Sequence, residues 1–352
     1  MKENLFNFTL DKLEKRMVEM GQKPFRARQL FKWIYEKKVL NFDDMTDISA
    51  AFRETLKENF ELTKPTIFTK QVSKDGTIKI LSEFADGNKV ESVLMRYNYG
   101  NAACVSSQVG CAMKCAFCAS GLLTKVRNLT VNEMVGQVQL LNDLLEEEGK
   151  GERVTHIVVM GTGEPFDNYD NVMDFIRIMN SPYAFEIGAR HITVSTCGVV
   201  DKIYKYAEEG LQTNLAISLH APNDTIRNKI MPISKRYDIK SLIDAVKYYE
   251  KTAGRRVTFE YILINNVNDS LKEANELVQL IKGTLAYVNL IPYNEVMEND
   301  FKRSTNDHTR KFFDYLMKHG INTTVRKEFG SDIDAACGQL RAKKEKILWR
   351  NY

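Results

Sequence analysis

The spacing of apolar residues divides the chain into three stretches of different periodicity. In the first stretch, apolar side chains recur at helical intervals with little β-branching, beginning with Phe8, Leu10, Leu13 and Met17. The same spacing continues to about residue 60. This pattern predicts a small helical accessory domain over residues 1–62.

The second stretch alternates apolar and polar residues, as a strand does when one of its faces is buried. Its alternating runs, residues 77–81 and 89–95, are broken by Asp75-Gly76 and by Asp86-Gly87-Asn88. Such residues favour the tight turns that join antiparallel strands. We therefore expect a β-hairpin connector over residues 63–98.

The third stretch, residues 99–345, repeats a pattern of apolar strand, loop and amphipathic helix. The expected strands are residues 103–107, 156–160, 191–195, 214–219, 257–263 and 287–291, and the helices between them include 131–145, 172–179, 239–249 and 271–281. Alternation of this kind predicts a parallel sheet, and six βα units are too few for a closed eight-stranded barrel. The expected fold class is therefore α/β, a partial (β/α)6 barrel that carries the helical domain and the hairpin extension. Functional residues should follow the carboxyl ends of the strands.

Membrane association is not expected for this chain of 352 residues. Its longest apolar runs are far shorter than the roughly 20 residues that span a bilayer. The N-terminal segment MKENLFNFTL has neither an apolar signal core nor a small-residue cleavage site. These features predict a cytoplasmic protein that does not bind membranes.

Charge is nearly balanced, with 50 Lys and Arg against 46 Asp and Glu. A net charge of +4 is too small to establish nucleic-acid binding. However, residues 1–40 hold ten basic residues against five acidic ones, and the C-terminal segment RAKKEKILWRNY is also basic. These clusters are either solvated helix faces or surfaces that face RNA.

The chain has six cysteines, and four of them fall between Cys104 and Cys118. Reducing compartments disfavour structural disulfides, so clustered thiols indicate metal binding or thiol chemistry. Cys111, Cys115 and Cys118 lie on one loop directly after the first expected barrel strand. Three thiolates can hold three irons of a cubane cluster and leave the fourth iron open, because fully protein-bound clusters use four cysteines. Zinc is the alternative, but it usually needs a fourth ligand, and no His lies between residues 118 and 156.

The spacing C-x3-C-x-aromatic-C, with Phe117 as the aromatic residue, resembles the radical S-adenosylmethionine superfamily. The resemblance implies a [4Fe-4S] cluster whose open iron is chelated by S-adenosylmethionine. It also implies reductive cleavage of that cofactor to a 5′-deoxyadenosyl radical, and a partial βα barrel as the fold. The fold expected from the hydrophobic pattern agrees with it.

Further motifs narrow the resemblance to the RlmN family, methyltransferases that modify carbon 2 of adenosine in 23S rRNA and tRNA. The motifs are SQVG at 107–110, GTGEP at 161–165, RHITVST at 190–196, LAISLHAP at 215–222, KIMPI at 229–233, NLIPYN at 289–294 and DIDAACGQL at 332–340. The resemblance implies two S-adenosylmethionine molecules per turnover, an external electron donor, rRNA and tRNA as partners, and a monomer.

Carried over residue by residue, the resemblance assigns a role to each site residue. It places the cluster on Cys111, Cys115 and Cys118, and the cofactor on Gly163, Glu164, Ser195, Ser218, Leu219, His220 and Asn294. It makes Cys337 the methyl carrier through an S-methylcysteine intermediate, Cys104 the thiol that later forms a disulfide with it, and Glu91 a proton acceptor. Without the resemblance, the alternative for Cys104 is a small buried side chain, and the alternative for Ser195 is a turn or cap residue. Cys197 matches no motif, and we assign it to packing.

Two other functions remain open. A sister enzyme methylates carbon 8 of adenosine with the same thiols, although Pro165 and Val109 favour the carbon 2 enzyme. The other alternative is a non-catalytic RNA-binding protein with a structural cluster, which would need neither an open iron nor a second pair of thiols.

Overall fold

A computed structural model describes residues 2–296, 299–330 and 332–333 of the chain. Within these residues a ten-stranded sheet runs in the order β14-β13-β12-β11-β10-β9-β6-β5-β4-β3. Neighbouring strands from β6 to β14 are parallel, and those from β3 to β6 are antiparallel. No helix among the described residues is long and apolar enough to cross a membrane.

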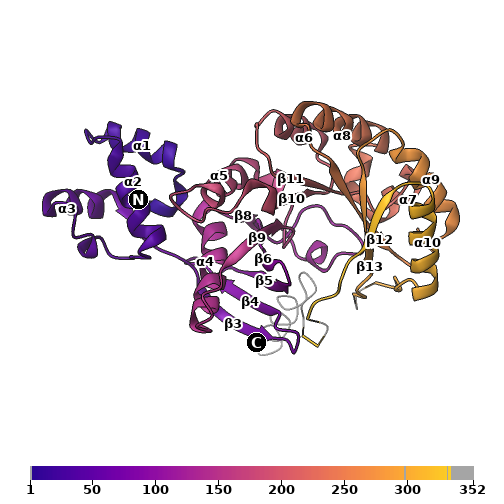
Figure 1. Cartoon of the computed structure of the whole chain (residues 1–352), viewed down its shortest axis with the longest axis horizontal. Coiled ribbons are helices and arrows are strands. Elements are labelled where there is room, and N and C mark those ends of the chain that lie inside the picture. The colour runs from indigo at the N-terminus through magenta and orange to yellow at the C-terminus, as the bar shows by residue number, and fades with distance from the viewer. Residues whose placement is uncertain (1, 297–298, 331, 334–352) are drawn as a thin grey trace.

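The N-terminal helices form a module at one end of the molecule (Figure 1). They are α1 (Leu10–Glu19), α2 (Phe25–Phe31) and α3 (Ala50–Asn59). The module contacts the barrel at several points: the Asn7 side chain accepts a hydrogen bond from the backbone N–H of Asn132, the rings of Tyr35 and Phe185 meet edge to face, and Lys12 and Lys38 form ion pairs with Asp174 and Glu146.

The hairpin extension is part of the same sheet as the barrel. It consists of β3 (Thr66–Val72), β4 (Ile78–Glu83) and β5 (Lys89–Tyr97), and β5 pairs with β6 (Gly100–Cys104). Both hairpin turns carry a glycine with positive φ, Gly76 at +83° and Gly87 at +78°, where a side chain would be strained. The predicted turns are confirmed, and the extension joins the barrel through the β5–β6 ladder.

All six expected barrel strands are present, and the predicted partial barrel is confirmed. The remaining strands are β9 (Val154–Val159), β10 (Ile192–Thr196), β11 (Asn214–Ser218), β12 (Val257–Leu263), β13 (Tyr287–Pro292) and β14 (Asn322–Val325), with four two-residue strands β1 (Glu3–Asn4), β2 (Phe60–Glu61), β7 (Gln108–Val109) and β8 (Arg127–Asn128). The helices are α4 (Val131–Glu147), α5 (Tyr169–Asn180), α6 (Val200–Ala207), α7 (Asp224–Ile230), α8 (Ile239–Ala253), α9 (Leu271–Ile281) and α10 (Asn306–Lys318). The first barrel strand ends at Cys104 rather than at the expected residue 107. Beyond it, the N–H of Val105 donates to Val158 of β9, and the N–H of Ser107 donates to Thr162 in the loop after β9.

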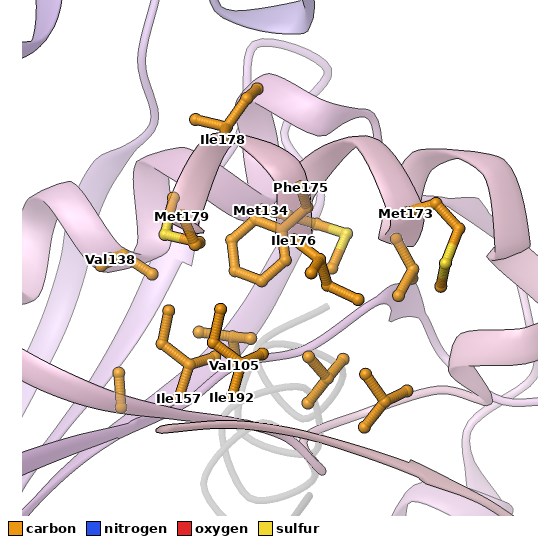
Figure 2. Close-up of a cluster of buried hydrophobic side chains, with 14 of the residues drawn as sticks. Val105, Met134, Val138, Ile157, Met173, Phe175, Ile176, Ile178, Met179 and Ile192 are labelled. Carbon is orange, nitrogen blue, oxygen red and sulfur yellow. The ribbon is translucent and has the colours of Figure 1, made fainter. Parts of the chain in front are cut away.

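The barrel core lies between the sheet and the helices that cover its outer face. Figure 2 shows side chains of α4 and α5, among them Met134 and Phe175, packed over Ile157 and Ile192 of the strands. All four of these side chains are buried. Truncation of a buried Phe to Ala typically costs about 3–5 kcal/mol. This core therefore fixes the positions of the strand ends on which the site is built.

Candidate active site

The barrel strands end at a cavity of about 770 Å³. The following residues expected from the sequence line it: Glu91, Cys104, Cys111, Cys115, Cys118, Gly163, Glu164, Ser195, Ser218, His220 and Asn294. Leu219 is fully buried and is not among the described residues that line the cavity. Cys337 lies outside the described residues. The fold thus brings site residues that lie between positions 91 and 294 of the sequence to the wall of one cavity.

The loop that carries Cys111, Cys115 and Cys118 is held by backbone hydrogen bonds at several points. The N–H of Cys111 donates to Leu123, and the N–H of Cys118 donates to the carbonyl of Cys115, both at 3.1 Å. The N–H of Ala116 donates to Ile230 at 2.9 Å. The three thiols are therefore presented on a constrained backbone.

The three thiols are close enough to influence one another. Burial raises the pKa of Cys115 well above its usual range, and the neighbouring Cys118 and Cys111 raise it further. No group of three or more His, Cys, Asp or Glu side chains in the described part of the chain is arranged to hold a single metal ion. In a cubane cluster each thiolate binds a different iron. Three adjacent thiols on a fixed loop at the cavity wall fit such a cluster, whose iron would relieve their mutual repulsion.

The loop after β9 packs tightly against the loop after β6. A Cβ added at Gly161 would lie 2.6 Å from Oγ of Ser106, and one added at Gly163 would lie 2.6 Å from Cβ of Gln108. Gly163 also has a φ of +111°, which non-glycine residues rarely adopt. Small residues are therefore required here, and they bring the next residue, Glu164, to the cavity.

The Glu164 carboxylate is buried and held by backbone donors. Oε1 accepts from the N–H of Phe166 at 3.0 Å, and Oε2 accepts from the N–H of Cys197 at 2.8 Å. Burial raises the pKa of Glu164, and the hydrogen bonds to Cys197 and Phe166 oppose that shift. A carboxylate oriented in this way can bind a ligand ammonium group.

The ends of β10 and β11 are joined by a buried arginine. Arg227 of α7 donates to the carbonyls of Cys197 and Leu219, at 2.6 and 3.1 Å. Its Nη1 has no hydrogen-bond partner among the described residues. Burial lowers the pKa of Arg227. The guanidinium thereby fixes two strand ends that face the cavity.

His220 is a buried histidine at the cavity wall. Burial, with a smaller contribution from the positive charge of Arg227, lowers the pKa of His220 to about 3. Its Nδ1 accepts the N–H of Ile262 at 3.0 Å, which leaves Nε2 as the protonated nitrogen. Ser195 and Ser218 lie nearby at the ends of β10 and β11, with their hydroxyl oxygens 3.5 Å apart.

Glu91 and Cys104 face the cavity from neighbouring strands. Val93 is paired with Cys104 in the β5–β6 ladder, and Glu91 lies two residues before Val93, so all three share one face of the sheet. Lys79 of β4 forms an ion pair with Glu91 at 2.8 Å. A carboxylate and a thiol therefore adjoin the same space as the three-cysteine loop.

Sequence reasoning missed some residues of the cavity. Glu260 of β12 lines it, is 6% exposed and accepts a hydrogen bond from Asn289 at 2.8 Å. An acidic residue inside a mostly apolar strand was the available signal. The Cys197 thiol packs with Ala221, Ile230 and Met231, while its backbone N–H holds Glu164.

A three-cysteine loop at the carboxyl end of a partial βα barrel defines the radical S-adenosylmethionine class of enzymes. The model of the Radical SAM superfamily matches residues 105–280. The model of the ribosomal RNA large subunit methyltransferase N-terminal domain matches residues 3–62, the stretch of the helical module.

Comparison with known proteins identifies the family within this class. The chain is 54% identical to the probable dual-specificity RNA methyltransferase RlmN of Spiroplasma citri, over 98% of this chain and 99% of that protein. It is 51% identical to the corresponding protein of Geobacillus kaustophilus (strain HTA426), over 97% and 93% of the two chains. A crystal structure of a radical SAM methyltransferase from Sphaerobacter thermophilus matches with a TM-score of 0.89 and 44% identity, over 96% of this chain and 98% of that one. The chain belongs to the RlmN family of radical S-adenosylmethionine RNA methyltransferases, which implies a [4Fe-4S] cluster and S-adenosylmethionine as its cofactors.

Proposed function

We propose that this chain methylates carbon 2 of adenosine in 23S rRNA and tRNA. The observation that carries the proposal is the placement of Glu91 and Cys104 on one face of the sheet, at the cavity that the three-cysteine loop also lines. The name of the relatives, dual-specificity RNA methyltransferase, supports two RNA substrates. A cytoplasmic location follows from such substrates.

Carbon 2 of adenine lies between two ring nitrogens and is too electron-poor to attack an electrophilic methyl group. Covalent catalysis with a radical step divides this reaction into accessible steps. When bound, the cluster and S-adenosylmethionine supply the 5′-deoxyadenosyl radical, and the oxidised cluster can take back one electron from the RNA adduct.

In the proposed sequence Cys337 is the methyl carrier. Its thiolate takes a methyl group from one S-adenosylmethionine by substitution, and a second molecule provides the radical that removes a hydrogen atom from this S-methyl group. The resulting methylene radical on Cys337 adds to carbon 2, which joins RNA and protein covalently. Glu91 then accepts the proton of carbon 2, and one electron leaves the adduct.

Cys104 is proposed to release the product. Its thiolate attacks the sulfur of Cys337, a disulfide forms, and the electron pair of the broken carbon–sulfur bond takes up a proton to complete the methyl group. An external reductant then restores both thiols by exchange. One chain carries every residue that this scheme uses, so we propose that a monomer is active.

The N-terminal module is proposed to bind the RNA backbone. Lys15, Lys23 and Lys32 are exposed on it, and phosphate contacts supply affinity without reading sequence. Phe25 is 52% exposed beside the guanidinium of Arg26, whereas Trp33 is buried. Phe25 is therefore the aromatic side chain of this module best placed to stack on a base. The target adenosine must leave its stack to reach the cavity, at a cost of a few kcal/mol.

The test is to modify 23S rRNA fragments and tRNA with the purified enzyme and to digest the products to nucleosides. Chromatography with mass spectrometry then separates 2-methyladenosine from 8-methyladenosine. The carbon 2 isomer is expected from both RNAs. The carbon 8 isomer would identify the sister activity. Unmodified RNA after incubation with cluster-loaded, reduced protein would favour the non-catalytic alternative.

A further inference from the structure

An ion pair lies inside the sheet next to the cavity. Nζ of Lys79 is 2.8 Å from Oε2 of Glu91, and the two side chains are 0% and 4% exposed. In the β4–β5 ladder Lys79 is opposite Val93 and Glu91 is opposite Leu81, so the pair is diagonal on one face. Glu91 lines the cavity, whereas Lys79 is not among the described residues that do so. The lysine therefore supports the carboxylate without reaching the space that substrate would fill.

The same face carries the thiol that is proposed to release the product. Cys104 is opposite Val93 in the β5–β6 ladder, so it is a diagonal neighbour of Glu91. Diagonal neighbours in antiparallel sheets lie about 7–8 Å apart. The RNA adduct has to lose the proton of carbon 2 and then the bond between the adjoining methylene carbon and the Cys337 sulfur, and this spacing lets Glu91 and Cys104 act on these two neighbouring positions in turn.

A fully buried lysine is costly unless an ionised partner lies beside it. A buried carboxylate likewise needs a partner of opposite charge beside it. The ammonium of Lys79 and the carboxylate of Glu91 are therefore a mutually dependent buried pair, in which each side chain fixes the position of the other.

We propose that Lys79 is the positioning residue of the proton acceptor: its ion pair holds the Glu91 carboxylate in place and directed at carbon 2 of the bound adduct. This inference rests on the proposed function. In the step concerned, the bond between carbon 2 and its hydrogen breaks, the proton passes to the Glu91 carboxylate, and the bonding electron pair stays in the ring. The one excess electron of the adduct leaves to an oxidised iron–sulfur centre, and a closed-shell aromatic thioether remains.

The test uses cluster-loaded Lys79→Met and Lys79→Gln enzymes. Loss of general-base function typically costs about 10²–10⁴-fold in rate. We expect a loss of turnover in this range, with normal methylation of Cys337 by peptide mass spectrometry and normal release of 5′-deoxyadenosine in the first turnover. Covalent RNA–protein adduct should accumulate on denaturing gels, and deuterium at carbon 2 should slow the variants more than the wild type. Lys79→Arg should restore part of the turnover.

The matched control is Lys89→Met, which breaks the more exposed pair with Glu83 on the same two strands. It should turn over normally without adduct. The proposal is overturned if the Lys79→Met and Lys79→Gln enzymes turn over like the wild type, or lose activity without adduct and without a larger isotope effect. Lys79→Gln keeps a hydrogen-bond donor and decides the question if Lys79→Met does not fold. Failure of the proposed function looks different, because the wild type would then form no 2-methyladenosine and Glu91→Gln would not accumulate adduct.

Discussion

Oε2 of Glu164 accepts a hydrogen bond from the backbone N–H of Cys197 at 2.8 Å, and this contact joins the loop after β9 to the end of β10. The second oxygen accepts the N–H of Phe166. Both contacts use main-chain donors, whose positions are set by the backbone rather than by side-chain rotamers. The carboxylate is therefore oriented before any cofactor binds, which reduces the entropy lost on binding.

Glu164→Gln should weaken S-adenosylmethionine binding about 10–100-fold. The amide has one oxygen, so its NH2 group would face one of the two N–H donors, and the charge that attracts the ligand ammonium is lost. Equilibrium binding of S-adenosylmethionine to the cluster-loaded protein measures the effect. Asp170→Asn, which changes an exposed carboxylate on α5, is the control and should bind normally. Unchanged affinity in the Gln variant would remove Glu164 from the cofactor site.

The elements best predicted from sequence are those whose pattern is strong locally. Strand β12 (Val257–Leu263) is rich in β-branched and aromatic residues, and α9 (Leu271–Ile281) follows the N-cap Ser270, which forms a capping box with Glu273. Strand β14 (Asn322–Val325) was not predicted, because it is polar and mostly exposed at the edge of the sheet.

The three-cysteine loop was readable from sequence because its residues are contiguous, but the supporting contacts were not. Glu91 and Lys79 are twelve positions apart, and only the β4–β5 register makes them neighbours. Arg227 holds carbonyls of Cys197 and Leu219 through tertiary packing that no local pattern encodes. Sequence reasoning therefore recovered candidate functional side chains and missed the residues that orient them.

Cys104→Ala should react once and then stop, with RNA still attached through Cys337. Its proposed role begins only after the new carbon–carbon bond has formed, so the earlier steps should proceed. Denaturing gels should show a protein band that carries nucleic acid, is lost on ribonuclease treatment and is absent from the Cys104→Ala/Cys337→Ala double variant. If the Cys104→Ala enzyme instead turns over like the wild type, Cys104 has no role in product release and is a packing residue of β6.

Because of His220, the free energy of unfolding should decrease when the pH is lowered into the mildly acidic range. Its pKa is about 3 when folded and about 6.5 in an unfolded chain, so the unfolded state takes up a proton first as the pH falls. The stabilisation is complete above pH about 6.5, and about 2 kcal/mol of it should be lost by pH 5. His220→Asn removes this titration while it keeps an acceptor for the N–H of Ile262 and tolerates the φ of +57°. Thermal unfolding at pH 7.5 and 5 should show a smaller acid destabilisation in the Asn variant, and equal losses would contradict the assignment.

Anaerobically prepared protein should contain one four-iron cluster held by Cys111, Cys115 and Cys118. These thiols share one constrained loop at the cavity wall, and an iron without a protein thiolate would be open to S-adenosylmethionine. Iron and sulfide analysis should show four of each per chain, and S-adenosylmethionine should change the electron paramagnetic resonance spectrum of the reduced cluster.

Serine substitution at Cys111, Cys115 or Cys118 should abolish the cluster. Cys197→Ser is the matched control, since this thiol belongs to a buried cluster that Cys115 packs against but has no proposed ligand role. Cys197→Ser and Cys337→Ala should both retain the iron, and stoichiometric zinc, or a cluster whose spectrum ignores S-adenosylmethionine, would refute this assignment of the loop.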